Sequence, residues 1–242
     1  MKMLTFAKRC SKEILRDPLN LFFGLGFPVV LILLLSAIQA SIPVELFAIE
    51  HLTPGITVFG LAFMTLFSAT LAAKDRESAF LQRLYTTPLK PSDFILGYML
   101  PILPLALGQS TVCYLLAIAL GLPVTVHILW AILMLLPIAV FYISLGLLCG
   151  SIFNVKQVGG ICGALLTNVS AWLSGVWFDL ELVGDVFQKI ADLLPFVHAV
   201  ELERAVIRGN IAEALPHLWP VVIYAGITLA GAVLLFLRQM KK

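Results

Sequence analysis

The longest stretch without a charged side chain decides the fold: FILGYMLPILPLALGQSTVCYLLAIALGLPVTVHILWAILMLLPIAVFYISLGLLCGSIFNV, residues 94–155. As a single helix with a rise of about 1.5 Å per residue, it would be about three times as long as the hydrocarbon core of a bilayer is thick. The chain must therefore fold back within it. The motif GLP at residues 121–123, followed by polar Thr125 and His127, is the best turn near its middle. This predicts two membrane spans, at residues 94–120 and 128–153.

The composition places the whole chain in a membrane. Hydrophobic residues make up 60% of it and charged residues only 12%, against about a quarter in soluble domains, and the mean hydropathy is +1.01. The 16 basic and 14 acidic residues cannot cover a soluble globule of 242 residues. Nucleic acid is excluded as a partner because there is no extended basic face. We interpret the four cysteines as small buried hydrophobic residues, because they lack the spacing of metal ligands: Cys10, Cys113, Cys149 and Cys162.

Four further runs are long enough, at about 20 residues, to cross a bilayer. They lie at residues 19–44, 54–73, 157–178 and 214–237, and they raise the number of predicted spans to six. An even number places both termini on one side, which then holds thirteen basic residues against three on the other side. Basic residues gather on the cytoplasmic side of membrane proteins. We therefore expect a multi-pass protein of the plasma membrane with both termini in the cytoplasm.

The segment before the first span predicts an amphipathic helix over residues 1–18. Met3, Ala7, Cys10 and Ile14 recur at helical spacing, while lysines and arginines occupy the other faces. These charges also make the segment unlike a signal peptide. We expect the helix to lie along the inner membrane surface, where its cations meet anionic lipid. The alternative is a solvated basic tail.

A second short helix is predicted between spans two and three, at residues 76–88. Its apolar patch of Phe80, Leu81 and Leu84 lies among charged residues on the cytoplasmic side. Such a helix is suited to a groove on a soluble partner protein, and the alternative is a helix that lies on lipid. The candidate docking residues are Arg76, Glu77, Phe80, Leu81, Arg83, Leu84 and Tyr85.

The outer segment at residues 179–213 is too long for a turn. Apolar residues from Leu182 to Leu194 form a helical stripe, Pro195 ends it, and a second helical piece follows at residues 198–208. We expect these two helices to dip back into the outer edge of the membrane, covered by protein or water.

Small residues at a spacing of four predict close contacts between helices. The pairs Gly146 with Gly150, and Gly159 with Gly163, would allow either packing within the chain or a dimer seam. None of the predicted spans contains Asp, Glu, Lys or Arg. Ion-coupled carriers and membrane-embedded hydrolases usually need such groups at membrane depth, so both classes are disfavoured.

This arrangement resembles the permease subunit of ABC-2 type ATP-binding-cassette transporters over nearly the whole chain. The order of the helices is similar, and so are Arg76-Glu77, Leu81, Arg83-Leu84 and Thr87-Pro88 before the third span. The most specific similarity lies in SGVWF at residues 174–178, IADLLPF at residues 190–196, and then Glu201, Arg204 and Gly209. The chain departs from the family at Asp179, where the family often has proline or a small residue. It departs again at Val183 and Gly184, where a proline is missing.

The resemblance implies a single ABC-2 type transmembrane domain over residues 1–242. The fold would be an all-α integral membrane protein of six transmembrane helices with an interfacial N-terminal helix, a cytoplasmic coupling helix and re-entrant outer helices. The chain has no phosphate-binding loop of the type GxxxxGK[ST]. ATP and Mg would therefore be bound by two separate ATPase subunits beneath a pair of permease chains, identical or related, and the chain itself would hold no cofactor or metal and catalyse no reaction.

The resemblance also assigns roles to residues. Residues 76–88 would be the coupling helix, and Leu194, Pro195, Phe196, Glu201 and Arg204 would form the outer gate. The cargo would be an amphipathic or lipid-linked molecule, a peptide or a drug. Two alternatives stay open at this point: a stand-alone channel or secondary transporter, and a membrane-embedded enzyme or scaffold.

Overall fold

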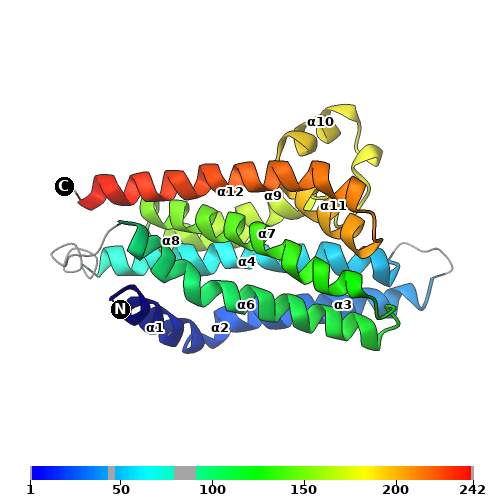
Figure 1. The fold of residues 1–242 in the computed structure, drawn as a ribbon, viewed down its shortest axis with the longest axis horizontal. Coiled ribbons are helices and arrows are strands. Elements are labelled where there is room, and N and C mark those ends of the chain that lie inside the picture. Colours follow the sequence, from blue (N-terminus) through cyan, green and yellow to red (C-terminus); the bar gives the residue numbers. More distant parts are fainter. Residues whose placement is uncertain (1, 43–46, 79–90, 241–242) are drawn as a thin grey trace.

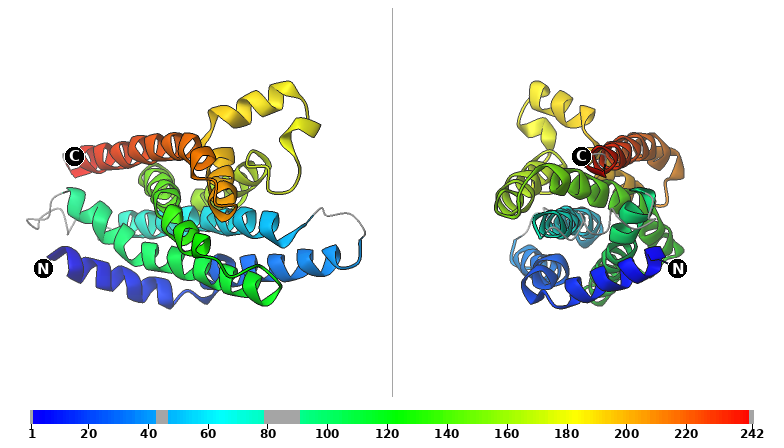
Figure 2. Two further views of the ribbon diagram at one scale, coloured as in Figure 1. Left: turned by 45° about the vertical axis from the view of Figure 1, so that its right-hand side comes forward. Right: turned by 90° about the vertical axis from the view of Figure 1, so that its left-hand side faces the viewer.

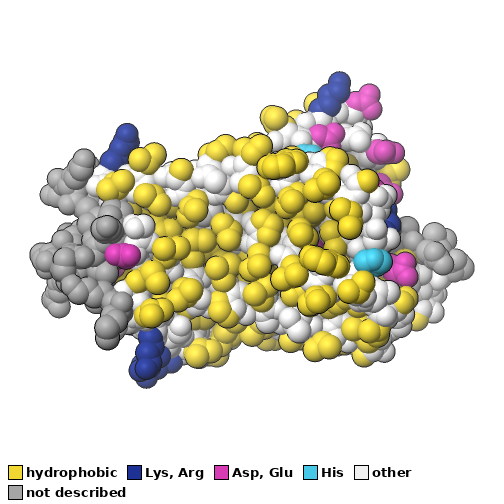
Figure 3. Space-filling view, in the orientation of Figure 1, with side chains coloured by type: hydrophobic (Ala, Val, Ile, Leu, Met, Phe, Trp, Pro, Cys, Tyr) yellow, Lys and Arg dark blue, Asp and Glu magenta, His cyan; other side chains and the backbone are white. Residues whose placement is uncertain are grey.

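The computed structural model describes residues 2–42, 47–78 and 91–240, and every regular element within these ranges is a helix. The helices lie mostly along one long axis, and both marked ends of the chain are at the same end of the bundle (Figure 1). The face visible in Figure 3 is apolar between the ends. Its lysines and arginines gather mainly at the end with the termini, and its acidic groups lie mostly at the other end. This polarity agrees with the predicted distribution of charge along the chain.

Five helical segments in the described ranges are long and apolar enough to cross a bilayer. The first combines α2 (Pro18–Leu21), a π-helical turn η1 (Phe22–Gly26) and α3 (Phe27–Gln39). The other four are single helices: α4 (Ile49–Glu77), α6 (Pro91–Ala119), α7 (Val126–Ile152) and α12 (Ile211–Met240). α4 and α12 span their predicted segments fully, whereas α6 and α7 each end one residue before the predicted end.

The predicted span at residues 157–178 corresponds to a shorter helical segment with different boundaries. The helical segment there begins earlier and ends earlier, as α8 (Val155–Val158), a π-helical stretch η2 (Gly159–Leu166) and α9 (Thr167–Trp172). Its first turn is polar, because Asn154 and Gln157 form a capping box around Lys156. The segment is not among the five that meet the length and hydropathy of a span.

The turn between α6 and α7 is confirmed where the sequence predicts it. Gly121 adopts a φ of +113°, a left-handed conformation that a glycine reaches without steric cost. The N–H of Leu122 donates to the carbonyl of Ala117 at 2.9 Å, which closes the C-terminus of α6. The chain then enters α7 at Val126.

α4 is the central helix of the bundle. Of its most apolar window, 89% is buried, against 22–56% for the other four spans. It contacts α3, α6, α7, α11 and the stretch η2, and the end-on view of Figure 2 shows the other helices around it.

α7 packs most closely against α4, through the predicted glycine pair in its C-terminal half. A Cβ at Gly146 would lie 2.2 Å from the carbonyl oxygen of Thr65, and one at Gly150 would lie 2.5 Å from that of Ala69. This pair therefore packs within the chain. A Cβ at Gly159 would meet nothing within 4 Å, and one at Gly163 would meet Leu66 at 3.4 Å, so the dimer seam stays a prediction for the second pair.

The N-terminal helix α1 (Lys2–Leu15) is amphipathic, as predicted, and it packs on α6. Its buried face consists of Phe6, Ala7, Cys10 and Ile14. The ring of Phe6 makes edge contacts with Phe94 and Tyr98 of α6, at centroid distances of 5.8 and 4.8 Å.

The outer segment forms a 3₁₀ turn η3 (Leu180–Leu182) and two helices, α10 (Asp185–Leu193) and α11 (Pro195–Ile207). Pro195 occupies the first position of α11, where its missing N–H costs nothing. α11 is buried against α4, α7 and α12, whereas α10 projects away from the bundle (Figure 1). Large side chains of the predicted apolar stripe on η3 and α10 are exposed within the described part of the chain, namely Leu182, Val186, Ile190 and Leu193.

The packing of α7 on α4 predicts that Gly146→Ala destabilises the protein. The added methyl group would overlap a backbone carbonyl that cannot rotate away, and overpacking of this kind costs about 1–3 kcal/mol. Gly108→Ala is the matched control, because a Cβ there meets nothing within 4 Å and alanine favours the helix. Thermal unfolding in detergent should separate the two variants, and equal midpoints would contradict the close packing.

Candidate functional site

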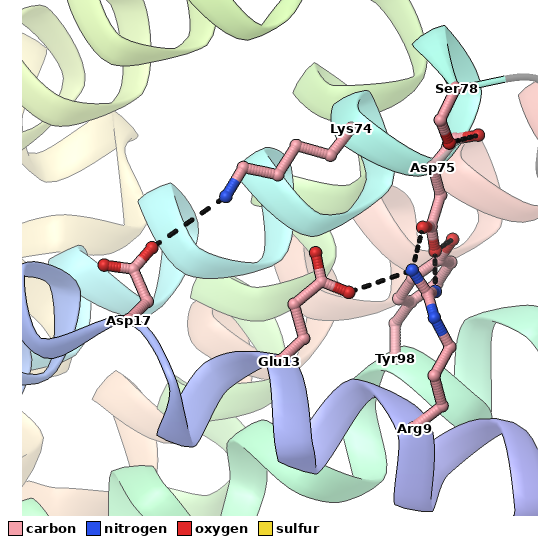
Figure 4. A network of polar contacts seen from close by, with 7 residues as sticks. All are labelled: Arg9, Glu13, Asp17, Lys74, Asp75, Ser78 and Tyr98. Atoms are coloured by element: carbon pink, nitrogen blue, oxygen red, sulfur yellow. Dashed lines mark hydrogen bonds and ion pairs between the residues drawn. The ribbon is translucent and has the colours of Figure 1, made fainter.

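At the end of the bundle that holds the chain termini, α4 carries a buried carboxylate that joins three helices. After the predicted topology, this end is called the inner end and the opposite end the outer end. Asp75 is 1% exposed. It accepts two hydrogen bonds from the guanidinium of Arg9 on α1, both at 2.5 Å, and one from the hydroxyl of Tyr98 on α6 at 2.7 Å. Figure 4 shows these side chains converging from α1, α4 and α6. A charge-assisted, bidentate pair of this kind is among the strongest polar contacts in proteins.

Two further ion pairs surround this carboxylate. Arg9 also contacts Glu13 one turn later in α1, at 2.9 Å, and Lys74 lies 3.9 Å from Asp17 (Figure 4). Burial opposes the charge on Arg9, but the hydrogen bonds and negative charge of Asp75 outweigh it and raise the pKa of Arg9. Burial also raises the pKa of the adjacent Cys10 thiol to about 12. The thiol therefore stays protonated and packs as a small hydrophobic group.

The next two residues of α4 belong to the predicted coupling set, and the structure places them at the last turn of that helix. Arg76 donates to the carbonyls of Ser151 and Phe153, the latter at 2.5 Å. Glu77 accepts from the N–H of Val155 at 2.8 Å. Both side chains therefore hold the connection between α7 and α8. The other predicted coupling residues lie outside the described residues: Phe80, Leu81, Arg83, Leu84 and Tyr85.

α12 also contacts the connection between α7 and α8. The side-chain amide of Gln239 donates to the carbonyl of Ser151 at 2.7 Å. Polar contacts thus gather α4, α7, α8 and α12 at the inner end, around the last turn of α4. With Asp75, they fix α1 and α6 to the same turn of α4.

At the outer end, the predicted gate residues come together on α11. The side chain of Phe196 is 7% exposed and lies against the rings of Phe141 and Tyr142 of α7. Arg204 donates to Glu201 at 2.7 Å and to the carbonyl of Gly175 at 3.1 Å. Leu194 lies at the N-cap position of α11 in an extended conformation, and Pro195 is buried. α11 is thereby tied to the segment that follows α9.

Two adjoining cavities, of about 330 and 220 Å³, lie beside this pair and share Gly175, Asp179 and Arg204. Asp179, where the sequence differs from the pattern that it otherwise resembles, therefore lines both cavities. In the larger one, Nδ1 of His198 lies 2.9 Å from Nδ1 of His217, and Nε2 of His198 lies 2.9 Å from the carbonyl of Asp192. Nε2 must donate to that carbonyl, so a neutral His198 accepts from His217. This chain of bonds links α10, α11 and α12.

A second buried carboxyl group lies on α11. Glu203 is fully buried, and one of its oxygens accepts from the hydroxyl of Tyr114 on α6 at 3.0 Å. Its other oxygen, Oε1, has no hydrogen-bond partner among the described residues. Burial raises the pKa of Glu203 well above its usual range, because an isolated charge is costly to bury. The neutral, protonated form of Glu203 is therefore favoured in the folded protein.

The sequence reasoning missed both buried carboxyl groups. The predicted second span ends at residue 73, before the charged residues Lys74 to Glu77, so Asp75 was not expected inside the bundle. The sequence contains a signal for each carboxyl group, because each acidic residue lies at helical spacing from apolar or small residues that form the buried face of its helix. Ser68, Leu71 and Ala72 precede Asp75 at helical spacing, and Ala199, Val200 and Val206 flank Glu203 in the same way. No group of three or more His, Cys, Asp or Glu suited to a metal ion occurs in the described ranges.

Comparison with known proteins identifies the family. A family model described as "ABC-2 type transporter" matches residues 1–207. The chain belongs to the ABC-2 type transporter family. The resemblance inferred from the sequence is thereby confirmed, and this multi-pass ABC-2 chain is a membrane component of an ABC transporter.

Curated relatives agree with the family. The chain is 27% identical to nodulation protein J of Bradyrhizobium diazoefficiens over 93% of this chain and 85% of that protein. It is 26% identical to nodulation protein J of Sinorhizobium fredii over 78% of this chain and 71% of that protein. A match to ABC transporter G family member 20 of Dictyostelium discoideum, at 24% identity, covers 71% of this chain and 24% of that larger protein. The match of the chain to part of a larger ABC transporter is consistent with a membrane unit that associates with ABC ATPase subunits.

Asp75→Asn should destabilise the inner end of this ABC-2 chain by about 2 kcal/mol, the value of a charged hydrogen-bond pair reduced for the partial exposure of Arg9. The asparagine cannot match the charge of Arg9. Thermal unfolding in detergent measures the effect. Asp17→Asn is the control, because its contact with Lys74 is long and half exposed, and exposed pairs contribute about 0–1 kcal/mol. A control as destabilised as Asp75→Asn would refute the anchor.

The burial of Glu203 predicts that the stability of the folded protein decreases as the pH rises. The folded protein holds the proton of Glu203 more tightly than the unfolded chain does, so stability falls as the pH rises above the unfolded pKa of about 4.3. Glu203→Gln keeps a neutral group of the same shape. Its unfolding midpoint relative to the wild type should therefore increase between pH 5 and 8, whereas the exposed Glu181→Gln control should show no such trend. A parallel pH profile for Glu203→Gln and the wild type would contradict a neutral Glu203.

Proposed function

We propose that this chain is the permease subunit of an ATP-driven ABC exporter. Two permease chains would pair and form the translocation path, and two separate ATPase subunits would bind beneath them and hold ATP and Mg. The family assignment supports this proposal, together with the lack of a phosphate-binding loop in the sequence. Within this proposal the chain catalyses no reaction and moves by rigid-body switching.

The observation that carries the proposal is the set of polar anchors at the inner end. Asp75, Arg76 and Glu77 lie in the last turn of α4, where the proposed coupling helix at residues 76–88 begins. Through these anchors, α4 is fixed to α1 and α6 on one side and to α7 and α8 on the other. A force applied to residues 79–90 would therefore reach all of these helices, as coupling to an ATPase requires. Arg76 and Glu77 serve this transmission within the chain in addition to their proposed place at the rim of the contact.

The proposal includes the topology that the charges favour. The predicted span at residues 157–178 would be the fifth of the six spans, because its helical part returns from the inner end alongside α4. Both termini would then be cytoplasmic and α1 interfacial, in a plasma membrane. α11 would be the re-entrant part of the outer segment, since it is buried among α4, α7 and α12.

The outer gate would consist of Leu194, Pro195, Phe196, Glu201 and Arg204. Opening would break the hydrogen bond from Arg204 to the carbonyl of Gly175, which ties α11 to the segment after α9. The pair of Arg204 with Glu201 lies within α11 and orients the guanidinium for that bond. The cargo would be an amphipathic or lipid-linked molecule, a peptide or a drug, because the described spans expose mainly apolar side chains.

Leu81→Asp combined with Leu84→Asp tests the coupling helix. Each change would place a charge in an apolar contact, so the affinity for the ATPase subunit should fall at least tenfold, as is typical when a central apolar anchor is lost. Co-purification in detergent measures association, and vesicles measure ATP-dependent transport. Leu182→Asp is the control, since Leu182 is 80% exposed on the outer segment. Retained association and transport in the double variant would refute the coupling role.

A further inference from the structure

The helix α1 has a groove on each side. One groove, of about 780 Å³, is lined by basic residues that include Lys8, Lys12 and Arg16. The other, of about 490 Å³, lies between α1 and α6 and is lined mainly by apolar residues that include Leu15 and Leu100. Lys8 lines both grooves. A cationic surface and an apolar surface therefore meet along one helix.

The basic groove has more positive charge than its own acids can neutralise. Both of its acidic residues already have cationic partners, since Glu13 contacts Arg9 at 2.9 Å and Asp17 lies 3.9 Å from Lys74. In the described part of the chain, no carboxylate lies within 4.0 Å of Lys8, Lys12 or Arg16. All three side chains are exposed. Lys8 and Lys12 are four residues apart and so lie on one face of α1.

Large apolar side chains on α1 and just after it are exposed in the described part of the chain. Leu4, Leu15, Leu19 and Phe22 are all more than half exposed. A soluble protein would rarely leave so many large side chains uncovered in one region. Cations beside exposed apolar side chains are typical of a helix at a membrane interface, where the charges meet headgroups and the apolar groups meet acyl chains.

We propose that the two grooves form one binding site for an anionic phospholipid of the inner leaflet. The lipid phosphate contacts the ammonium groups of Lys8 and Lys12, and an acyl chain lies in the groove between α1 and α6, against Leu15 and Leu100. The junction at Lys8 favours a lipid over an acidic protein surface, because a protein side chain in the basic groove would leave the apolar groove empty.

This site would regulate the inner end of the bundle. The bound lipid would hold α1 against α6 at the same place where Arg9 reaches Asp75 and Tyr98 (Figure 4). The inference does not depend on the proposed ATP-driven transport, because it concerns lipid binding by the chain alone. It goes beyond a general attraction to the membrane, since it assigns both parts of a lipid to a defined pair of grooves.

The test compares two double variants of the full chain in detergent. Phosphatidylglycerol and phosphatidylcholine of equal chain length are titrated, and native mass spectrometry counts the lipid that each protein retains. Lys8→Gln with Lys12→Gln should bind phosphatidylglycerol about 25-fold more weakly, since each cation near a lipid surface contributes about 1 kcal/mol. The control pair, Lys156→Gln with Lys189→Gln, removes two exposed lysines elsewhere and should bind like the wild type.

A second pair of variants tests the apolar groove. Leu15→Gln should reduce the preference for long-chain over dihexanoyl phosphatidylglycerol, whereas Leu182→Gln, at another exposed leucine, should not. With the wild type alone, raising the salt from 0.05 to 0.5 M should reduce the preference for phosphatidylglycerol over phosphatidylcholine, because salt screens exposed charges. This measurement keeps the proposal testable if a lysine variant fails to fold.

Several results would overturn the proposal. Equal affinities for the two lipids in the wild type would exclude recognition of the anionic headgroup. Displacement of phosphatidylglycerol by millimolar inorganic phosphate would identify a site for free phosphate. Unchanged lipid affinity in the lysine variant, with loss of the co-purifying ATPase subunit, would assign the basic groove to a protein partner. The first two outcomes would leave the proposed ATP-driven transport by the assembled complex untouched, because that transport is measured separately.

Discussion

The hydroxyl groups of Thr65 and Ser68 on α4 donate to the carbonyls of Tyr142 and Ile143 on α7, at 2.9 and 3.0 Å. These bonds form because Gly146 and Gly150 let the two backbones approach closely. In hydrocarbon there is no hydrophobic effect to bring helices together, so association depends on such close packing and on hydrogen bonds between helices. α12 and α11 in turn pack against α7. The contact between α4 and α7 is therefore the one on which the remaining helices are arranged.

Because α4 is central, it touches both candidate sites. Its last turn carries Asp75, Arg76 and Glu77, and its first turns lie beside the outer site, where a Cβ at Gly55 would be 3.8 Å from the guanidinium of Arg204. A helix enclosed on all sides cannot bend freely, since close-packed interiors transmit strain. In the proposed mechanism, a displacement of α4 at the inner end would therefore also reach the contacts that close α11.

The sequence predicted the elements whose signals are local. Charge-free runs located α3, α4, α6, α7 and α12, and the GLP motif located the turn at Gly121, because the bilayer and the backbone impose these patterns directly. Contacts between segments that are distant in the sequence are harder to predict from local sequence patterns. The pairing of Asp75 with Arg9 joins residues 66 positions apart, and an amphipathic pattern cannot name the partner of a buried charge. The boundaries of the segment at residues 155–172 were missed because a polar capping box and glycines break its apolar pattern.

The two buried carboxyl groups show why a list of charged residues is a poor guide to what lies inside a membrane protein. Asp75 has two donors from a cation and one from a phenol, so its negative charge is matched where it is buried. Glu203 has one neutral donor and an oxygen without a partner among the described residues, so the neutral acid is favoured. Glu203 enters the bundle on α11, from a segment that the sequence places outside the spans. Spans without charges therefore do not exclude a proton-binding group within the bundle. In this chain, that group joins α11 to α6 through Tyr114.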